Sequence, residues 1–128
     1  LTEMHAKMHR LAVQAGGTID GIWFCPHTAV DNCECRKPKP GMILDIIERF
    51  KADAAETWLV GDSLRDLQAI DAAGGKSALV LTGKGKKTLA KHEQDLPEHT
   101  QVFDNLLAFS QYIMRENTQI EEAAQAIL

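Results

Sequence analysis

All three cysteines of the chain lie within one short stretch, together with a histidine. They form a Cys-Pro-His set at residues 25–27 and, after five further residues, a Cys-Glu-Cys set at residues 33–35. Thiolate sulfur and imidazole nitrogen are donors that Zn²⁺ prefers, and a closed set of three sulfurs and one nitrogen is typical of structural rather than catalytic zinc. The spacing predicts a zinc loop over residues 25–37, whereas the alternative is three cysteines that are buried or free. The expected ligands are Cys25, His27, Cys33 and Cys35.

Two basic residues, Arg36 and Lys37, follow the last of these cysteines directly. A loop held by zinc also holds its neighbours rigidly, and a fixed guanidinium and ammonium beside a divalent cation bind phosphate well. Pro38 restricts the backbone of Lys37 to extended conformations, so Lys37 is less free than most surface lysines. We therefore expect both residues to bind phosphate. The alternative is a solvated basic pair.

A second motif reads Val-Gly-Asp-Ser-Leu-Arg-Asp over residues 60–66. Gly61 lets the chain turn sharply after an apolar run, which leaves Asp62 at the edge of a sheet, where Mg²⁺ takes oxygen ligands. The alternative for Asp62 is an ordinary turn residue. Asp66 has two interpretations that the sequence leaves open: direct metal ligation, or a supporting role in a capping box with Ser63.

The elements expected to position these motifs alternate between helices and strands. Apolar residues at spacings of three and four predict helices over residues 2–15, 41–50, 63–73 and 88–93 and from 104 onward. Runs rich in β-branched, aromatic and other apolar residues predict strands over residues 19–24, 57–60, 77–81 and 101–103.

Such alternation predicts an α/β protein, with a Rossmann-like, mostly parallel sheet and helices on both faces, in a single domain over residues 1–128. Ligands of such sheets bind at the carboxyl ends of the strands. The zinc loop, Asp62 and the glycine-lysine loop at residues 82–87 are therefore expected at one edge of the sheet.

Composition excludes several kinds of partner. The 128 residues include 14 basic and 18 acidic ones, for a net charge of −4, so no excess positive charge is available to bind nucleic acid or an anionic membrane. No apolar run approaches the roughly 20 residues that span a bilayer. An odd number of cysteines argues against disulfides, and thiolates that hold zinc suit a reducing compartment. We expect a monomeric, cytoplasmic protein.

The segments CPH…CECRKPKPGM, TWLVGDSLRDLQAIDAAG and ALVLTGKG together resemble a known family. They are similar to the C-terminal two-thirds of the D-glycero-D-manno-heptose-1,7-bisphosphate 7-phosphatases, capless members of the haloacid dehalogenase-like superfamily. The resemblance implies a Mg²⁺-dependent sugar phosphatase of lipopolysaccharide heptose synthesis, which removes the 7-phosphate through an aspartyl-phosphate. It also implies that zinc is structural at the four residues named above, that Lys37 neutralises the transferred phosphoryl group, that Asp62 binds magnesium and that Arg36 contacts the remaining phosphate.

The family's Asp-x-Asp strand and its Thr-Asn-Gln segment have no counterpart in this sequence. In the family, the first of these aspartates is the nucleophile and the second the general acid. Because the chain also begins with Leu1 rather than methionine, we expect a fragment whose N-terminal strand is missing and which is inactive in isolation. Two alternatives stay open: the histidinol-phosphate phosphatases, which share the zinc loop, and a non-catalytic zinc-binding interaction module.

Overall fold

A parallel sheet forms the centre of the molecule in a computed structural model, which describes residues 2–26 and 33–127, the last of them (117–127) by backbone alone. Its three strands are β1 (Trp58–Gly61), β2 (Lys76–Val80) and β3 (Gln101–Phe103), in the order β1-β2-β3. Both pairs of strands are parallel. β2 is the central strand, and four of its five residues are buried. Burial on both faces is expected for a central parallel strand and explains why most of its residues are apolar.

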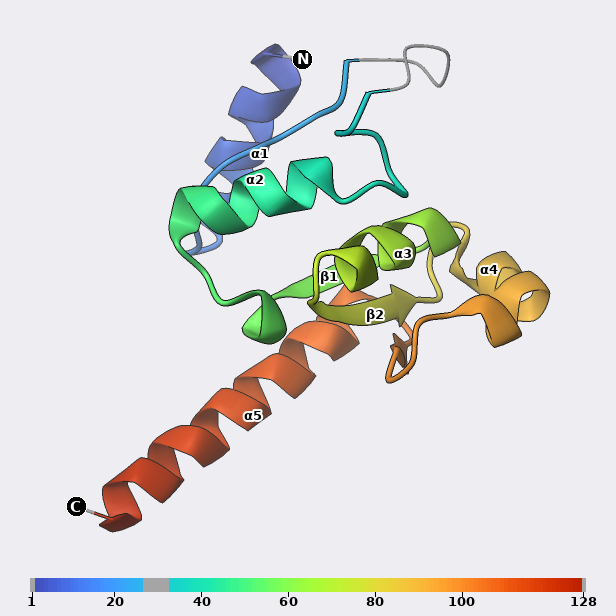
Figure 1. Cartoon of the computed structure of the whole chain (residues 1–128). Coiled ribbons are helices and arrows are strands. Elements are labelled where there is room, and N and C mark those ends of the chain that lie inside the picture. The colour runs from blue at the N-terminus through green and yellow to red at the C-terminus, as the bar shows by residue number, and fades with distance from the viewer. Residues whose placement is uncertain (1, 27–32, 128) are drawn as a thin grey trace.

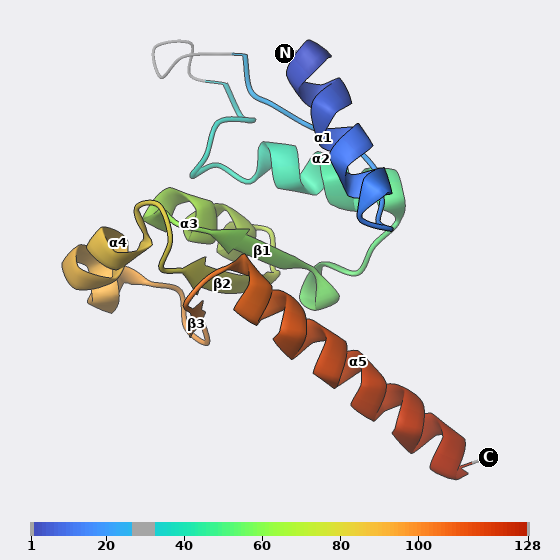
Figure 2. The ribbon, with the colours of Figure 1, turned by 180° about the vertical axis from the view of Figure 1, so that it is seen from behind.

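Helices cover both faces of this sheet (Figures 1 and 2). α2 and α3 lie on one face, and the first turns of α5 lie against the other before this helix extends away from the sheet. α1 lies beside α2 on the side away from the sheet, and α4 follows β2. The helices are α1 (Thr2–Gln14), α2 (Gly41–Phe50), α3 (Leu64–Ala72), α4 (Gly85–His92) and α5 (Leu106–Ile127), with short 3-10 turns at Ala54–Glu56 and Glu93–Asp95. The arrangement confirms the α/β class and the mostly parallel sheet that the sequence predicts.

Apolar side chains pack on each face of the sheet. On one face, Ile43 of α2 packs against Ala69 and Ile70 of α3, and all three are buried. On the other face, rings from β1, β3 and α5 contact each other, with centroids 5.4 to 6.0 Å apart in edge-to-face or tilted geometry. These rings belong to Trp58, Phe103, Phe109 and Tyr112.

The strand predicted over residues 19–24 does not form, and that prediction is wrong. The segment is irregular and makes no sheet pairing, and Trp23 instead packs edge-to-face on Phe50 of α2, with centroids 5.7 Å apart. A strand requires a hydrogen-bonding neighbour, which the apolar pattern of the segment cannot supply by itself. The prediction that the zinc loop follows a strand is therefore wrong as well.

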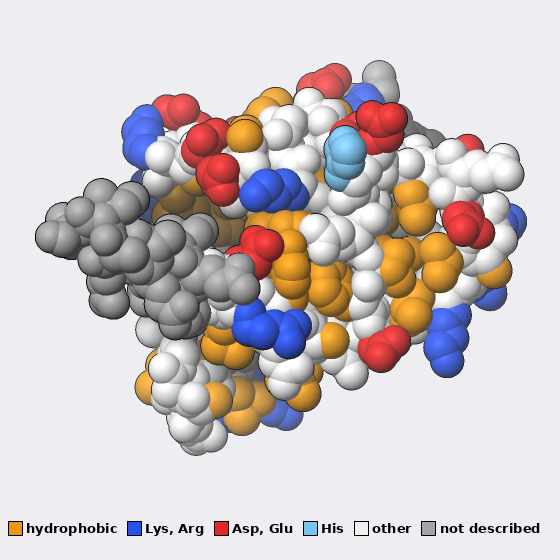
Figure 3. Space-filling view, turned by 90° about the horizontal axis from the view of Figure 1, so that it is seen from below, with side chains coloured by type: hydrophobic (Ala, Val, Ile, Leu, Met, Phe, Trp, Pro, Cys, Tyr) orange, Lys and Arg blue, Asp and Glu red, His pale blue; other side chains and the backbone are white. Residues whose placement is uncertain are grey.

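The other elements begin within a few residues of their predicted limits. The helix expected from residue 88 begins at Gly85, and the last helix begins at Leu106 rather than 104. Seen from the α5 side, acidic and basic side chains are interspersed among apolar ones (Figure 3). Of the helices that the structure describes, none is long and apolar enough to cross a membrane.

Candidate active site

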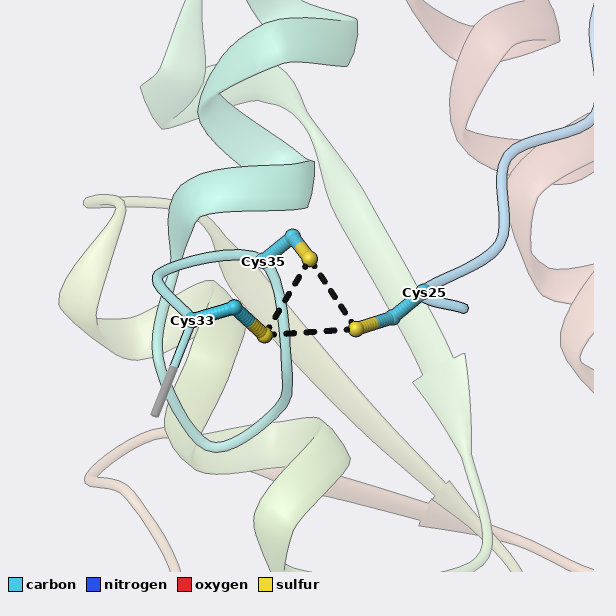
Figure 4. A group of neighbouring side chains, drawn as sticks. All are labelled: Cys25, Cys33 and Cys35. Carbon is cyan, nitrogen blue, oxygen red and sulfur yellow. Dashed lines mark hydrogen bonds between the residues drawn. The ribbon is translucent and has the colours of Figure 1, made fainter. Parts of the chain in front are cut away.

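The three cysteines of the predicted zinc loop face one another (Figure 4). Cys25 approaches from the segment after Trp23, whereas Cys33 and Cys35 come from the turn before α2, and their sulfurs are 2.9 to 3.4 Å apart. Tetrahedral zinc with sulfur ligands at about 2.3 Å requires sulfurs about 3.8 Å apart, so a small outward movement fits the ion. The three thiols can therefore hold one zinc ion. The fourth predicted ligand, His27, lies outside the described residues.

The thiols also shift one another's pKa in opposite directions. Desolvation alone would raise the pKa of Cys33, but hydrogen bonds with Cys35 and Cys25 outweigh it and lower that pKa to about 7. Hydrogen bonds with Cys25 and Cys33 raise the pKa of Cys35 to about 12. Thiols this close compete for protons, and a cation among them favours all three thiolates. The donor set therefore fits a metal better than it fits three independent thiols.

Lys37 leaves the cysteine turn toward α3 and meets Asp66 there. The Lys37 ammonium donates to Asp66 Oδ1 at 2.5 Å, and the Ser63 hydroxyl donates to Oδ2 at 2.8 Å. Asp66 is only 8% exposed, and its burial alone would raise the pKa of the carboxyl. The hydrogen bonds from Lys37 and Ser63 more than offset this and hold the pKa below its usual value of 3.8. Asp66 is therefore ionised at neutral pH and orients the Lys37 ammonium.

The capping box, one of the two interpretations left open for Asp66, forms only in part. The Ser63 hydroxyl donates to the carboxylate of Asp66 and makes no side-chain hydrogen bond to a backbone amide of α3. The backbone amide of Ser63 does help to lower the pKa of Asp66, as the return half of a capping box would. Gly61 lets the Asp66 carboxylate lie close to the backbone of β1, because a Cβ at residue 61 would lie 2.7 Å from Asp66 Oδ2.

Asp62 lies directly after β1, as the sequence predicts. Its Oδ2 accepts a hydrogen bond from the backbone amide of Lys84 at 2.9 Å, and its carbonyl oxygen accepts one from the Thr88 hydroxyl at 2.7 Å. Gly83 has φ +56° and passes so close that a Cβ there would lie 2.4 Å from Oδ2. Among the described residues, no basic side chain forms an ion pair with Asp62. Its negative charge is therefore available to a cation.

These groups open into one hollow of about 460 Å³, called here the carboxyl-end hollow because it lies at the carboxyl ends of β1 and β2. Its lining includes Lys37, Asp62, Asp66, Thr82 and Gly83. Of the predicted site residues, Lys37, Asp62 and Asp66 line this hollow, whereas Arg36 lines a neighbouring one together with Cys25 and Cys35. Such an arrangement places an ammonium and a carboxylate where a phosphate and its counter-cation can bind side by side.

Sequence reasoning missed the polar groups that bond to Asp62. Thr88 is 26 residues from Asp62, and the Lys84 amide is 22 residues away. A threonine at the start of a helix is too common to mark a site, and every residue but proline has a backbone amide. The one local signal was the Gly-Lys-Gly stretch after β2, since its glycines indicate a loop that passes close to a neighbour.

The sequence profile of the HAD-hydrolase-like family matches residues 34–109. The chain belongs to this family. The match includes β1, β2 and β3 and also the residues of the carboxyl-end hollow.

Individual relatives of this HAD-hydrolase-like chain are named D-glycero-beta-D-manno-heptose-1,7-bisphosphate 7-phosphatase. The one from Neisseria meningitidis serogroup B is 81% identical over 118 residues, which are 92% of this chain and 63% of the relative. The one from Bordetella bronchiseptica is 49% identical over 116 residues, which are 91% of this chain and 64% of the relative. The chain thus spans a little under two-thirds of the length of these relatives.

Two crystal structures resemble the fold of this HAD-hydrolase-like chain. One is D,D-heptose 1,7-bisphosphate phosphatase from B. bronchiseptica complexed with magnesium and phosphate, with a TM-score of 0.85 and 49% identity over 90% of this chain and 63% of that one. The other is D,D-heptose 1,7-bisphosphate phosphatase from Burkholderia thailandensis, with a TM-score of 0.67 and 50% identity over 87% of this chain and 60% of that one. The resemblance to the heptose-bisphosphate phosphatases, drawn from three motifs, is therefore confirmed.

Proposed function

We propose that this chain is the metal- and phosphate-binding part of a D-glycero-D-manno-heptose 1,7-bisphosphate 7-phosphatase, a Mg²⁺-dependent phosphomonoesterase of lipopolysaccharide heptose synthesis. The observation that carries the proposal is the meeting of Lys37 and Asp62 in one hollow at the carboxyl ends of parallel strands. The names of the relatives, and the magnesium and phosphate in the B. bronchiseptica crystal structure, support it.

Lys37 provides the positive charge for the phosphoryl group. Its side chain is 41% exposed and lines the carboxyl-end hollow while its ammonium remains paired with Asp66. An ammonium held in place before the substrate arrives stabilises the negative charge of a transferring phosphoryl group without reorganisation. Asp66 is a positioning residue, because its carboxylate is already engaged by Lys37 and Ser63.

Two metal ions have distinct roles in the proposal. Asp62 is one ligand of Mg²⁺, which when bound would neutralise charge on the phosphoryl oxygens. Cys25, Cys33 and Cys35 bind a structural Zn²⁺, with His27, outside the described residues, as the fourth ligand. Because Arg36 and Lys37 follow Cys35 directly, a closed zinc site holds both cations in place.

The complete protein removes the 7-phosphate through an aspartyl-phosphate. This needs an Asp-x-Asp pair, in which one carboxylate attacks phosphorus and the other protonates the leaving sugar oxygen. The 128-residue sequence has no such pair, so the chain in isolation is expected to bind phosphate without hydrolysing the sugar ester. A small sugar bisphosphate is the only partner proposed, with the protein a monomer in the reducing cytoplasm.

The test uses a chain completed at its N-terminus with the preceding segment of the N. meningitidis relative. We expect its kcat/KM to be higher for heptose 1,7-bisphosphate than for histidinol phosphate. Lys37→Ala should lower kcat/KM on the order of 10²–10³-fold, because it removes a charge that stabilises the transition state. Lys86→Ala removes the same charge from an exposed position on α4 and is the matched control. A preference for histidinol phosphate, or equal effects of the two substitutions, would contradict the proposal.

A further inference from the structure

The ion pair between Lys37 and Asp66 also brings together the residues that precede them in the chain, Arg36 and Arg65. Both arginines line a second hollow of about 260 Å³, called here the arginine hollow, and Trp23 lines it as well. Lys37 lines both this hollow and the carboxyl-end hollow. The two hollows are therefore neighbours that share one cation.

Neither arginine is neutralised by a side chain that the structure describes. Over residues 2–26 and 33–116, no ion pair and no side-chain hydrogen bond holds the guanidinium of Arg36 or of Arg65. Arg65 also stands in the first turn of α3, where the helix dipole favours anionic side chains. The two guanidiniums beside this hollow also repel each other. An anion bound between them removes both this repulsion and the unfavourable interaction of Arg65 with the helix dipole. The planar fork of each guanidinium matches phosphate oxygens in particular.

We infer that Arg65 is a specificity-determining residue, which binds, together with Arg36, the phosphate that the reaction leaves on the sugar. The inference rests on the proposed function, because it uses the other end of the same substrate. The phosphoryl group that is removed binds on the Lys37 and Asp62 side, and the retained phosphate binds in the arginine hollow. Trp23, whose ring is held against Phe50, provides an apolar wall for the carbon atoms between the two phosphates.

The test measures binding to the 128-residue chain loaded with Zn²⁺ and Mg²⁺, by isothermal titration calorimetry. The three probes are heptose 1,7-bisphosphate, heptose 7-phosphate and inorganic phosphate. We expect Arg65→Ala to weaken bisphosphate binding by about ten- to a hundredfold, the loss that follows from one charge-assisted hydrogen bond, and to leave the other two probes unchanged. Arg65→Lys should restore part of the affinity, because it keeps the charge but not the fork. Arg49→Ala, at an exposed position of α2 away from both hollows, is the matched control.

Two results would overturn the role of Arg65: an equal loss for all three probes in Arg65→Ala, or a bisphosphate affinity no higher than that for heptose 7-phosphate in the unmodified chain. Inorganic phosphate separates this inference from the proposed function. Lys37→Ala should abolish its binding at the carboxyl-end hollow. Undiminished inorganic phosphate binding in Lys37→Ala would contradict the proposed function, while the effect of Arg65→Ala on the bisphosphate would still decide the inference.

Discussion

The two ends of the sheet carry two hollows of different character. The one at the amino ends of the strands, called here the amino-end hollow, is the larger, at about 580 Å³. Its polar groups are bonded to one another: the Gln101 amide donates to the Tyr112 hydroxyl at 3.2 Å, and that hydroxyl donates to Glu116 at 2.8 Å. Lys76 pairs with Glu56 at 3.4 Å and lies 5.5 Å above the ring of Trp58. Two acidic residues of its lining, Asp71 and Glu98, form no ion pair with the other described residues.

The carboxyl-end hollow is smaller, and its charges are also only partly matched. Asp62 has no ion-pair partner among the described residues. Lys37 is paired with Asp66 and also lines the hollow. The hollows differ in what surrounds them, since the loops that leave the carboxyl ends of parallel strands bring distant residues and backbone amides to one edge. The comparison teaches that position at the carboxyl ends of the strands, rather than volume, identifies the site in this fold.

Removing the zinc should have the largest effect, because structural zinc sites in small peptides contribute about 10–16 kcal/mol. We expect one zinc per chain by elemental analysis and much less in Cys33→Ser. Amide hydrogen exchange should then rise over residues 33–37 at the carboxyl-end hollow and stay slow over residues 76–80 of β2. Full zinc content in Cys33→Ser would remove this residue from the ligand set.

Replacing Asp62, at the carboxyl ends of the strands, should have the next largest effect, and Asp71 at the amino ends provides its matched control. In the N-terminally completed chain, Asp62→Asn is expected to lower turnover on the order of 10²–10³-fold and to raise the Mg²⁺ concentration needed for half-maximal rate, because it removes an anionic metal ligand. Asp71→Asn makes the same change at the lining of the amino-end hollow and should leave both quantities unchanged. An unaltered Mg²⁺ requirement in Asp62→Asn would exclude Asp62 from the metal site.

A smaller effect is expected from the ion pairs at the two ends of the sheet, Lys37–Asp66 and Lys76–Glu56, which should contribute differently to the free energy of unfolding. Asp66→Asn is expected to lower the free energy of unfolding at pH 7 by about 1–3 kcal/mol, because it weakens a charge-assisted bond in a mostly buried site. Glu56→Gln breaks the exposed pair with Lys76, whose side chains are 74% and 40% exposed, and should cost less than about 1 kcal/mol. Urea unfolding measures both differences.

The pH dependence of the Asp66 contribution has a definite sign. Its pKa is lower in the folded state than the ordinary 3.8, so its ionised form stabilises the fold. The difference between the unmodified chain and Asp66→Asn should be complete above the ordinary carboxyl pKa and decrease as the pH falls below it, toward the lowered folded-state value. A difference that grows on acidification would contradict the assigned role of the carboxylate.

The sequence by itself determined most elements of the fold and the chemistry of the site. Apolar spacing is a local property, so it located α1, α2, α3 and the three strands of the sheet to within a few residues. The position of Asp62 directly after β1 and of Lys37 two residues after Cys35 could be predicted for the same reason, because each depends only on nearby residues.

Only the tertiary structure decided which of these groups meet. Lys37 and Asp66 are 29 residues apart, and nothing in either neighbourhood specifies the other as its partner. The same holds for Arg36 and Arg65, which share the arginine hollow although they are far apart in the sequence. Residues 19–24 have the composition of a strand but pack on α2, since strand formation depends on a neighbouring backbone that no local pattern contains. Contacts between distant residues are set by packing of the whole chain, and local periodicity does not encode them.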